Sequence, residues 1–292
     1  ITDVRITDRV INRLHQSSDA DILVPGGTVS ILGTTSIRIK DLHEIRPTIE
    51  EIDYIIDMAA GMIPQLQKQR YIRAYAGVRP LVGTGDSARD DRSVTRGYAL
   101  IDHEESGLAN FTSVIGGKLT TFRAMAEKTV DLACQKLGVC ETCETETRPL
   151  PETDACRWTV PGHSSREWIK GQSPEDQLLC ECEMVSKQVV DGILQSIRDQ
   201  NGRPDIRAIG LRSRLGKGVC QGAFSGVRVA AYMYEKGYLD SEKGMDYLKD
   251  FLSGRWKGIR PVLWNTTLVQ EELQEAMHCG FFGLEFEGDD HG

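Results

Sequence analysis

Three cysteines and a serine stand at a spacing that could hold a metal centre. Cys180 and Cys182 are separated by one residue, and Cys220 follows within the glycine-rich stretch 216–225. Thiolates are favoured ligands of zinc and of iron–sulfur clusters, and a [2Fe–2S] cluster needs four outer ligands because each iron takes two. Ser225 stands where the fourth ligand is expected. A serine oxygen is a harder ligand than a thiolate, so this residue decides how well the site suits a cluster.

A second group of residues could face a cofactor. The run Gly116–Arg123 lies where a strand is expected to pass into a helix. Glycines let the backbone approach a ligand closely, and unpaired N–H groups at a helix start point toward electron-rich atoms. The spacing alone is weak evidence, because tight turns use glycine for steric reasons. No stretch of the chain matches the G-x-G-x-x-G dinucleotide fingerprint convincingly.

The first half of the chain is expected to be a sheet with a few helices. Apolar and polar residues alternate around Pro25–Gly27, which predicts a β-hairpin over 20–24 and 28–32 that residues 35–39 continue. Periodicity and capping signals predict the further elements: a helix that begins with a Thr48–Glu51 capping box and ends near 61–64, strands over 71–78, 97–101 and 111–115, a polar loop at 83–92, and a helix over 119–137.

The second half carries the cysteines between short helices. Residues 138–177 lack sustained periodicity and are interpreted as a connector. Cys140 and Cys143 have zinc-like spacing, but no second ligand pair follows at finger or ribbon spacing, so they are interpreted as reduced thiols. The pattern predicts these elements: helices over 186–199, from about 222 and over 268–277, and a short helical or extended piece at 206–211.

Composition limits the class of protein. The net charge of −8 over 292 residues argues against a nucleic-acid partner, because phosphate binding rests on clustered Lys and Arg. The sequence contains neither an apolar run long enough for a membrane span nor a recognisable secretory leader. It begins at Ile1 rather than Met, which indicates a processed or cut product. Eight unevenly spaced cysteines indicate reduced thiols or metal ligands in the cytoplasm.

Several stretches together resemble one enzyme family. Ala76–Leu81, Thr95–Tyr98, Gly116–Arg123 and Pro25–Thr35 closely resemble the FAD-dependent glycerol-3-phosphate dehydrogenases. The cysteine module and Arg255–Gly258 narrow the resemblance to the large catalytic subunits of the anaerobic bacterial enzymes. The resemblance runs over nearly the whole chain, although the chain corresponds to only part of the family protein.

The resemblance implies an α+β fold. A substrate domain with an antiparallel sheet and helices, part of a glycine/D-amino-acid-oxidase-like fold, is expected before a small helical BFD-like [2Fe–2S] module. The expected division is a substrate-binding and flavin-facing part over 1–139, the connector over 140–177, the cysteine module over 178–238 and a helical tail over 239–292. Because the dinucleotide fingerprint of the family precedes Ile1, this chain alone is expected to hold FAD poorly and to be inactive.

The resemblance also implies roles for individual residues. Arg79, Arg96 and Lys118 look like the cationic groups that receive the phosphate and hydroxyls of the substrate, a task that suits charge-assisted hydrogen bonds. The loop that meets the flavin ring corresponds to Gly116, Gly117, Lys118, Leu119, Thr120 and Thr121. His103 is a candidate for the base, although a lone histidine is more often structural.

The implied reaction oxidises sn-glycerol 3-phosphate to dihydroxyacetone phosphate with FAD and passes electrons through iron–sulfur centres toward quinone. The implied partners are two further subunits, one carrying iron–sulfur centres and one associated with the membrane, which would hold the protein at the periphery of the inner membrane.

The chain departs from the cluster pattern of the family at one ligand position. That pattern is C-x-C, a spacer, and C-x-x-x-x-C, so Ser225 replaces the last cysteine, and Cys279 or Cys156 could substitute for it in space. Two other functions therefore stay open. The chain could serve as a redox or metal-binding interaction module that docks a catalytic subunit to its partners, or as a cluster-free scaffold.

Overall fold

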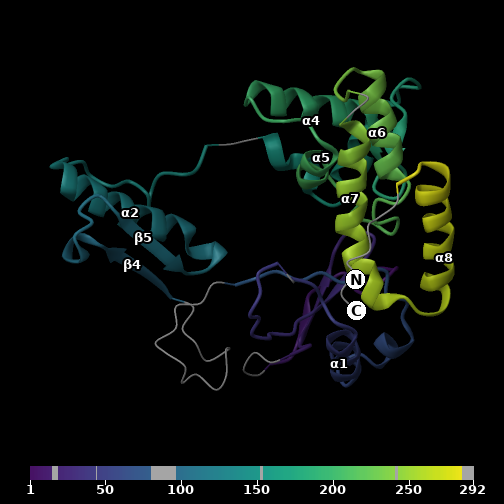
Figure 1. The fold of residues 1–292 in the computed structure, drawn as a ribbon, viewed down its shortest axis with the longest axis horizontal. Helices are drawn as coiled ribbons and strands as arrows, with labels where there is room; N and C mark the ends of the chain where they lie inside the picture. The colour runs from purple at the N-terminus through teal and green to yellow at the C-terminus, as the bar shows by residue number, and fades with distance from the viewer. Residues whose placement is uncertain (15–18, 44, 80–96, 152–153, 241–242, 285–292) are drawn as a thin grey trace. The chain divides into compact units, whose positions relative to one another are not determined.

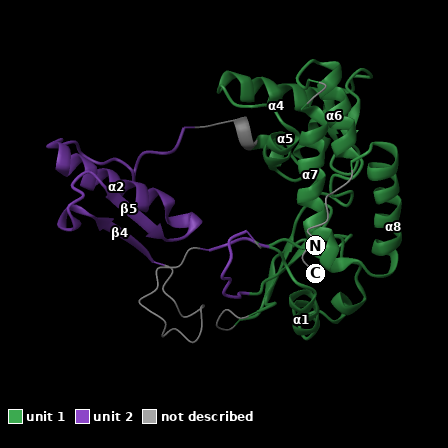
Figure 2. Cartoon of the chain, viewed as in Figure 1, with its two compact units in different colours: residues 1–35, 46–76, 153–292 green, residues 36–45, 77–152 purple. Residues whose placement is uncertain are grey.

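The chain folds into two compact units of helices and small antiparallel sheets (Figures 1 and 2). Unit 1 comprises residues 1–35, 46–76 and 153–292, and unit 2 comprises residues 36–45 and 77–152. The computed structural model describes residues 1–14, 19–43, 45–79, 97–151, 154–240 and 243–284. The predicted α+β class agrees with these elements, whereas the predicted division by role at 139, 177 and 238 stays a prediction.

The N-terminal sheet of unit 1 confirms the predicted hairpin. Strands β1 (Ile11–Asn12), β2 (Ile22–Pro25) and β3 (Ser30–Gly33) pair antiparallel in that order. Leu23 lies opposite Leu32 in the register, and the Leu23 side chain is fully buried in a small core that this sheet shares with the following helix.

Helix α1 (Ile49–Ala60) begins with the predicted capping box. The Glu51 N–H donates to Thr48 Oγ1 at 3.2 Å, and the Thr48 N–H donates to Glu51 Oε2 at 3.2 Å. The hydroxyl of Thr35 donates to Glu51 Oε1 at 2.6 Å. The prediction that residues 35–39 continue the sheet is therefore wrong, because the chain leaves β3 at Gly33 and Thr35 bonds to the helix start instead.

The strand predicted over 71–78 is also wrong. Tyr71 makes an isolated β-bridge, and the rest of the segment is not strand. The Ala74 N–H donates to Gly258 O at 2.7 Å, so this segment bonds to helix α7 (Gly244–Ile259) rather than to a sheet. A Cβ at Gly258 would lie 2.2 Å from Ala74 O, which explains why the helix carries glycine at this approach.

The largest core of unit 1 lies among the helices that follow the cysteines (Figure 1). Ser186 caps the first of these helices by accepting from the Val189 N–H, and Asp205 caps the second through the Ala208 N–H. The helices are α4 (Lys187–Asp199), α5 (Ile206–Arg212), α6 (Ser225–Glu235) and α7. The predicted helices at 186–199 and from about 222 are confirmed, and the piece at 206–211 is helical. Helix α7 lies within the predicted helical tail, but no helix was placed at its residues.

The stretch 138–177, interpreted as a connector, contains regular structure. A 3₁₀ segment (Asp154–Thr159) and helix α3 (His163–Gly171) fall within it. The predicted tail helix is confirmed as α8 (Asn265–Glu275). Further short helical turns lie between these elements. They are 3₁₀ turns at Pro64–Lys68, Glu104–Ser106, Leu119–Thr121 and Arg260–Val262, and a π-helical turn at Ala276–Phe281.

Unit 2 is an antiparallel pair of strands with one long helix. β4 (Tyr98–Asp102) and β5 (Thr112–Gly116) pair with Tyr98 opposite Gly116, and α2 (Phe122–Leu137) follows. Lys136 of α2 forms ion pairs with Asp102 at 2.8 Å and with Glu104 at 2.9 Å. These elements confirm the strands and helix predicted here, while the polar loop predicted at 83–92 lies outside the described residues.

Candidate metal centre and flavin-facing turn

The structure brings the three predicted thiols together. Cys180 ends strand β6 (Leu178–Cys180), which pairs with β7 (Val185–Ser186), and Cys182 lies in the turn between them. Cys182 Sγ lies 3.6 Å from Cys180 Sγ and 3.4 Å from Cys220 Sγ, and the three sulfurs are all within 4.8 Å of one another. Sulfurs bound to one tetrahedral metal at 2.3 Å lie roughly 3.8 Å apart, so the thiols are close to a ligating arrangement.

Ser225 completes a set of four donors. It is the first residue of α6, it is 2% exposed, and its Oγ lies 3.5 Å from Cys220 Sγ. Cys180 and Ser225 are buried, whereas Cys182 and Cys220 are half-buried. Three thiols and one hydroxyl fit a thiophilic metal or an iron–sulfur centre in ligand type. Cys279 is not part of this group, since its Sγ contacts Leu284 O at 3.3 Å, and the side chain of Cys156 lies outside the described residues.

The thiols are electrostatically unequal. Hydrogen bonds from the Cys180 and Cys182 thiols lower the pKa of Cys220, and hydrogen bonds with Cys180 and Cys220 raise the pKa of Cys182. The Gly222 N–H, 3.5 Å from Cys220 Sγ, favours the Cys220 thiolate as well. A single thiolate shared by three sulfurs would therefore be centred on Cys220, the sulfur next to Ser225.

The cysteine pair predicted to remain as free thiols lies elsewhere. Cys140 and Cys143 are exposed in unit 2, and the Cys143 Sγ contacts the Thr145 hydroxyl at 3.3 Å. Among the described residues the only group of potential ligands gathered for a metal is the one at Cys180, Cys182 and Cys220. The interpretation of Cys140 and Cys143 as reduced thiols stays a prediction.

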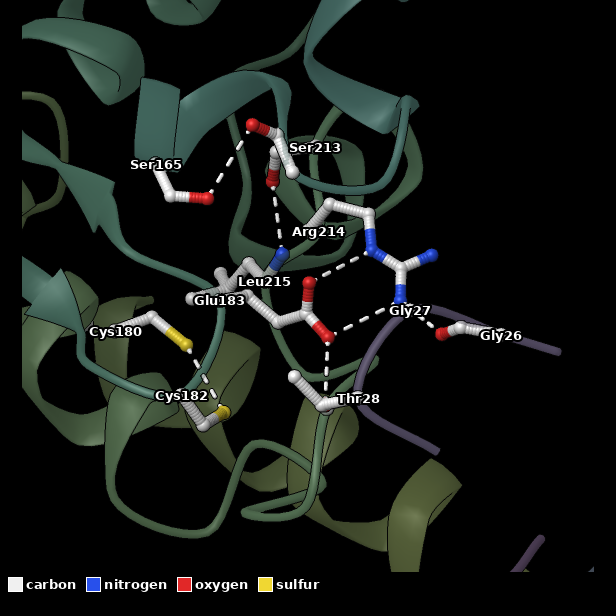
Figure 3. A network of polar contacts seen from close by, with 12 residues as sticks. Gly26, Gly27, Thr28, Ser165, Cys180, Cys182, Glu183, Ser213, Arg214 and Leu215 are labelled. Atoms are coloured by element: carbon white, nitrogen blue, oxygen red, sulfur yellow. Dashed lines mark hydrogen bonds and ion pairs between the residues drawn. The ribbon is translucent and has the colours of Figure 1, made fainter. Parts of the chain in front are cut away.

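A buried ion pair holds the cysteine turn, and the sequence did not predict it. Glu183 follows Cys182 directly, and its carboxylate accepts from Arg214 Nε at 3.0 Å and from Arg214 Nη2 at 3.1 Å (Figure 3). The two side chains are 4% and 11% exposed. The Thr28 hydroxyl also donates to Glu183 at 3.1 Å, and Arg214 Nη2 donates to Gly26 O at 2.6 Å. The N-terminal hairpin is thereby bonded to the residue beside Cys182.

Two glycines are required for this packing. Gly27 has φ +89°, and a Cβ there would lie 2.7 Å from Arg214 Nη2. A Cβ at Gly218 would lie 2.8 Å from Cys182 Sγ and 2.8 Å from the Glu183 carboxylate. Close approach therefore explains why both loops carry glycine at these positions.

The turn expected to face a flavin lies in unit 2. Gly116, the last residue of β5, and Gly117 have φ +83° and +80°. The Lys118 N–H donates to Thr121 Oγ1 at 2.9 Å, which orders the entry to α2. The side chains of Lys118, Leu119 and Thr120 are exposed, and Leu119 is 90% exposed. These side chains are therefore open to solvent, and the contact of the turn with flavin stays a prediction.

The residues expected to receive substrate are only partly described. Arg79 is exposed at the end of a described segment of unit 2, and Arg96 lies outside the described residues. The convergence of Arg79, Arg96 and Lys118 thus stays a prediction. His103 follows β4, its Nε2 lies 3.0 Å from Ser113 Oγ, and its ring contacts Phe111 with centroids 5.2 Å apart. These contacts suit a structural histidine, and its role as a base stays a prediction.

Sequence comparison relates the chain to one class of protein, the glycerol-3-phosphate dehydrogenases. It is 39% identical over 129 residues to glycerol-3-phosphate dehydrogenase of Synechocystis, over 43% of this chain and 23% of that protein.

The similarity is longer to one particular protein of that class. The chain is 37% identical over 311 residues to a subunit of the anaerobic glycerol-3-phosphate dehydrogenase of Escherichia coli K12, over 99% of this chain and 56% of that protein. It is 33% identical over 302 residues to the corresponding protein of Haloferax volcanii, over 96% of this chain and 50% of that protein. The resemblance expected from the motifs is confirmed, and the chain spans about half the length of the curated relatives it matches.

Two other comparisons found no match, and the helices were also searched for a membrane span. No family model matches the chain, and no solved structure does. Among the described residues, no helix is both long and apolar enough to cross a bilayer.

Proposed function

We propose that the chain is part of a flavin-dependent dehydrogenase that oxidises sn-glycerol 3-phosphate to dihydroxyacetone phosphate. The observation that carries this proposal is the 37% identity, over 99% of the chain, to the matched subunit of the anaerobic Escherichia coli enzyme. The gathering of Cys180, Cys182 and Cys220 supports a route for electrons out of the same protein. In this proposal the electrons pass through iron–sulfur centres toward quinone.

Cationic side chains of unit 2 would bind the substrate. Arg79 and Lys118 are exposed, and Arg96 belongs to a motif that resembles the same family. A guanidinium donates two parallel hydrogen bonds to a phosphate, whereas the ammonium of Lys118 acts as a compact charge. We assign the phosphate to the two arginines and assign Lys118 to the substrate hydroxyls or to the flavin ring.

The turn from Gly116 to Thr121 would face FAD. Bound FAD would accept the hydride from the substrate carbon, which is chemistry that the side chains of the chain cannot supply. The exposed side chain of Lys118 would place positive charge beside the reduced ring, and backbone N–H groups of the turn would add donors. His103 is the candidate acceptor for the hydroxyl proton, which requires its Nε2 to exchange Ser113 for substrate.

The cysteine module would hold a [2Fe–2S] cluster through Cys180, Cys182, Cys220 and Ser225. The donor types and the short distances between them support this assignment. Two further subunits, one carrying iron–sulfur centres and one associated with the membrane, would accept the electrons, so that the protein lies in the cytoplasm at the periphery of the inner membrane. The proposed roles divide the chain at 139, 177 and 238, with the BFD-like module over 178–238.

A second candidate function is a redox or metal-binding module that mainly docks subunits. The large core that surrounds the thiols favours it, because that core belongs to unit 1 whereas the flavin-facing turn belongs to unit 2. The same docking module without a bound cluster would be a scaffold that carries no electrons.

Cofactor content of the full-length protein, purified anaerobically, separates these functions. The proposal predicts FAD together with iron and acid-labile sulfide. Iron and sulfide without FAD would support the docking module. FAD without iron and sulfide would refute the cluster assignment, and the absence of all three would refute the proposal.

A further inference from the structure

Helix α7 and the segment after Tyr71 carry two guanidiniums that pair with no carboxylate of the described residues. Arg255 of α7 makes no hydrogen bond or ion pair within this described part, and its guanidinium lies against the Phe251 ring, 4.8 Å from the centroid. Arg73 Nε is buried and likewise finds no hydrogen-bond partner there. Arg214, by contrast, is fully paired with Glu183.

Arg255 lies over the loop that holds Cys220. Its Nη2 lies 2.9 Å from the position of a Cβ on Gly216, and its Nε lies 3.7 Å from that of a Cβ on Gly222. These two glycines precede and follow Cys220, and Gly222 donates its N–H to the Cys220 sulfur. The Arg255 guanidinium therefore lies against the turn that carries Cys220. A side chain in place of Gly216 would displace the guanidinium from this position.

Arg73 is held beside Arg255 by the backbone of α7 and by the loop. Arg73 Nη2 donates to Gly254 O at 3.4 Å, and Nη1 donates to Gln221 Oε1 at 3.5 Å. Gln221 is 5% exposed and directly follows Cys220. Burial and, as a smaller cause, the charge of Arg73 lower the pKa of Arg255 to about 10.

Such an arrangement is costly unless an anion offsets it. Arginine stays charged at neutral pH, and a desolvated charge without a counter-charge is unfavourable. Arg255 approaches Gly216 and Gly222 on either side of Cys220, so a metal–thiolate centre held at Cys220 would place negative charge beside the guanidinium. A [2Fe–2S] cluster with four anionic ligands carries a net charge of about −2 when oxidised and about −3 when reduced, as ligand counting gives.

We propose that Arg255, supported by Arg73, supplies the positive charge that offsets a metal–thiolate centre held at Cys220. The inference rests on the proposed metal centre and adds a positioning and tuning role for residues outside its ligands. It implies a trade-off. The arginine pair destabilises the metal-free protein and stabilises the metal-loaded one.

The test compares Arg255→Gln with Arg255→Lys and with Arg207→Gln, an exposed arginine of α5. In the full-length protein, Arg255→Gln should raise the melting temperature of the metal-free form and lower the reduction potential of the cluster, because removal of a positive charge disfavours the added electron. A tenfold change in relative affinity for the reduced form corresponds to about 59 mV for one electron. Arg255→Lys should lie between Arg255→Gln and the unchanged protein, and Arg207→Gln should change neither value.

A titration with Co²⁺ tests the role of Arg255 even if the protein binds no iron–sulfur cluster. If the unchanged protein holds no iron and sulfide, the cluster assignment fails, and Co²⁺ then serves as the probe of the thiols through its thiolate charge-transfer absorption. Arg255→Gln should weaken Co²⁺ binding at least about tenfold, equivalent to 1.4 kcal/mol.

Three results would overturn the inference. One is an unchanged reduction potential and cobalt affinity in Arg255→Gln. Another is a lower melting temperature of its metal-free form, which would show that some other anion already partners Arg255. The last is a rise in that temperature on adding inorganic phosphate that Arg255→Gln abolishes, which would assign the arginine pair to a free anion.

Discussion

Arg214 donates from Nε to Glu183 Oε2 at 3.0 Å and from Nη2 to Glu183 Oε1 at 3.1 Å, inside the protein. This pair fixes the residue next to Cys182. Arg214 Nη2 also donates to Gly26 O, and Glu183 Oε1 also accepts from the Thr28 hydroxyl, both in the N-terminal hairpin turn. Thr28 and Glu183 are 155 residues apart in the chain, so one bidentate ion pair joins the cysteine turn to a distant hairpin.

Glu183→Gln should strongly destabilise unit 1. The change leaves the Arg214 charge buried without its counter-charge, and breaking a buried pair in this way costs about 3–5 kcal/mol. Chemical denaturation measures the loss. Glu181→Gln is the matched control, because Glu181 flanks Cys182 on the other side and pairs with Arg228 at the surface, where ion pairs contribute roughly 0–1 kcal/mol. Equal losses for the two variants would contradict the importance of the buried pair.

Gly218→Ala should disturb the cysteine turn. The new Cβ would meet Cys182 Sγ and the Glu183 carboxylate at 2.8 Å, so we expect a loss of about 1–3 kcal/mol and a lower metal content. Gly192→Ala in α4 is the control, since a Cβ there meets nothing within 4 Å and alanine favours a helix by up to about 1 kcal/mol. If Gly218→Ala retained full stability and metal, the close packing around Cys182 would not constrain the site.

Ser225→Cys should increase the iron and sulfide content of the protein. The hydroxyl already lies 3.5 Å from Cys220 Sγ, and a thiolate is a softer ligand for iron than a serine oxygen. Ser225→Ala removes the oxygen and should lower the content below that of the unchanged protein. Identical iron and sulfide in all three proteins would show that residue 225 is not a ligand.

Arg79→Ala should raise the KM for sn-glycerol 3-phosphate in the full-length protein. Hydrogen bonds to charged groups contribute roughly 1.5–3 kcal/mol, so we expect an increase of roughly 10- to 100-fold. Arg207→Ala, on the exposed surface of α5, should leave the KM unchanged. A steady-state response of Arg79→Ala equal to that of the unchanged enzyme would remove Arg79 from the phosphate site.

Glu271 of α8 should make stability fall as the pH rises toward neutrality. Burial raises the pKa of this carboxyl from 4.5 to about 7. A folded-state pKa above the unfolded value means that the stabilising contribution of the protonated group is complete below pH 4.5 and is lost as the pH rises through 7.

Glu271→Gln should therefore be more stable than the unchanged protein at pH 8, by about 1–3 kcal/mol, with the difference vanishing near pH 4.5. Thermal unfolding across this pH range measures it, and Glu272→Gln, at an exposed position, is the control. A difference that does not depend on pH would contradict the raised pKa of Glu271.

Local signals predicted the parts of the fold that local bonds determine. The hairpin around Pro25–Gly27 and the Thr48–Glu51 capping box involve neighbours in sequence, and both are present. The gathering of Cys180, Cys182 and Cys220 followed from their spacing and from the resemblance. Helix α7 was not predicted because its glycines weaken the helical pattern, and the contact of Gly258 with Ala74 that requires glycine is visible only in the folded chain.

Sequence patterns did not predict which residues contact each other across long distances in the chain. Glu183 and Arg214 are 31 residues apart, and neither stands in a motif that marks it as buried. Arg255 lies in a run that carries the family resemblance, yet its approach to Gly216 and Gly222 depends on how α7 packs across the loop. Alternating residues at 71–78 suggested a strand, whereas the partner of Ala74 is the end of a helix.

Addition of sn-glycerol 3-phosphate to the full-length protein under anaerobic conditions tests the central claim most directly. We predict that the substrate bleaches the flavin absorbance and then produces the electron paramagnetic resonance signal of a reduced [2Fe–2S] cluster, and that Cys220→Ala retains the bleaching while losing the signal. Flavin that stays oxidised in the presence of substrate would contradict the proposed function, and a cluster signal that persists in Cys220→Ala would contradict the assignment of the electron route to these thiols.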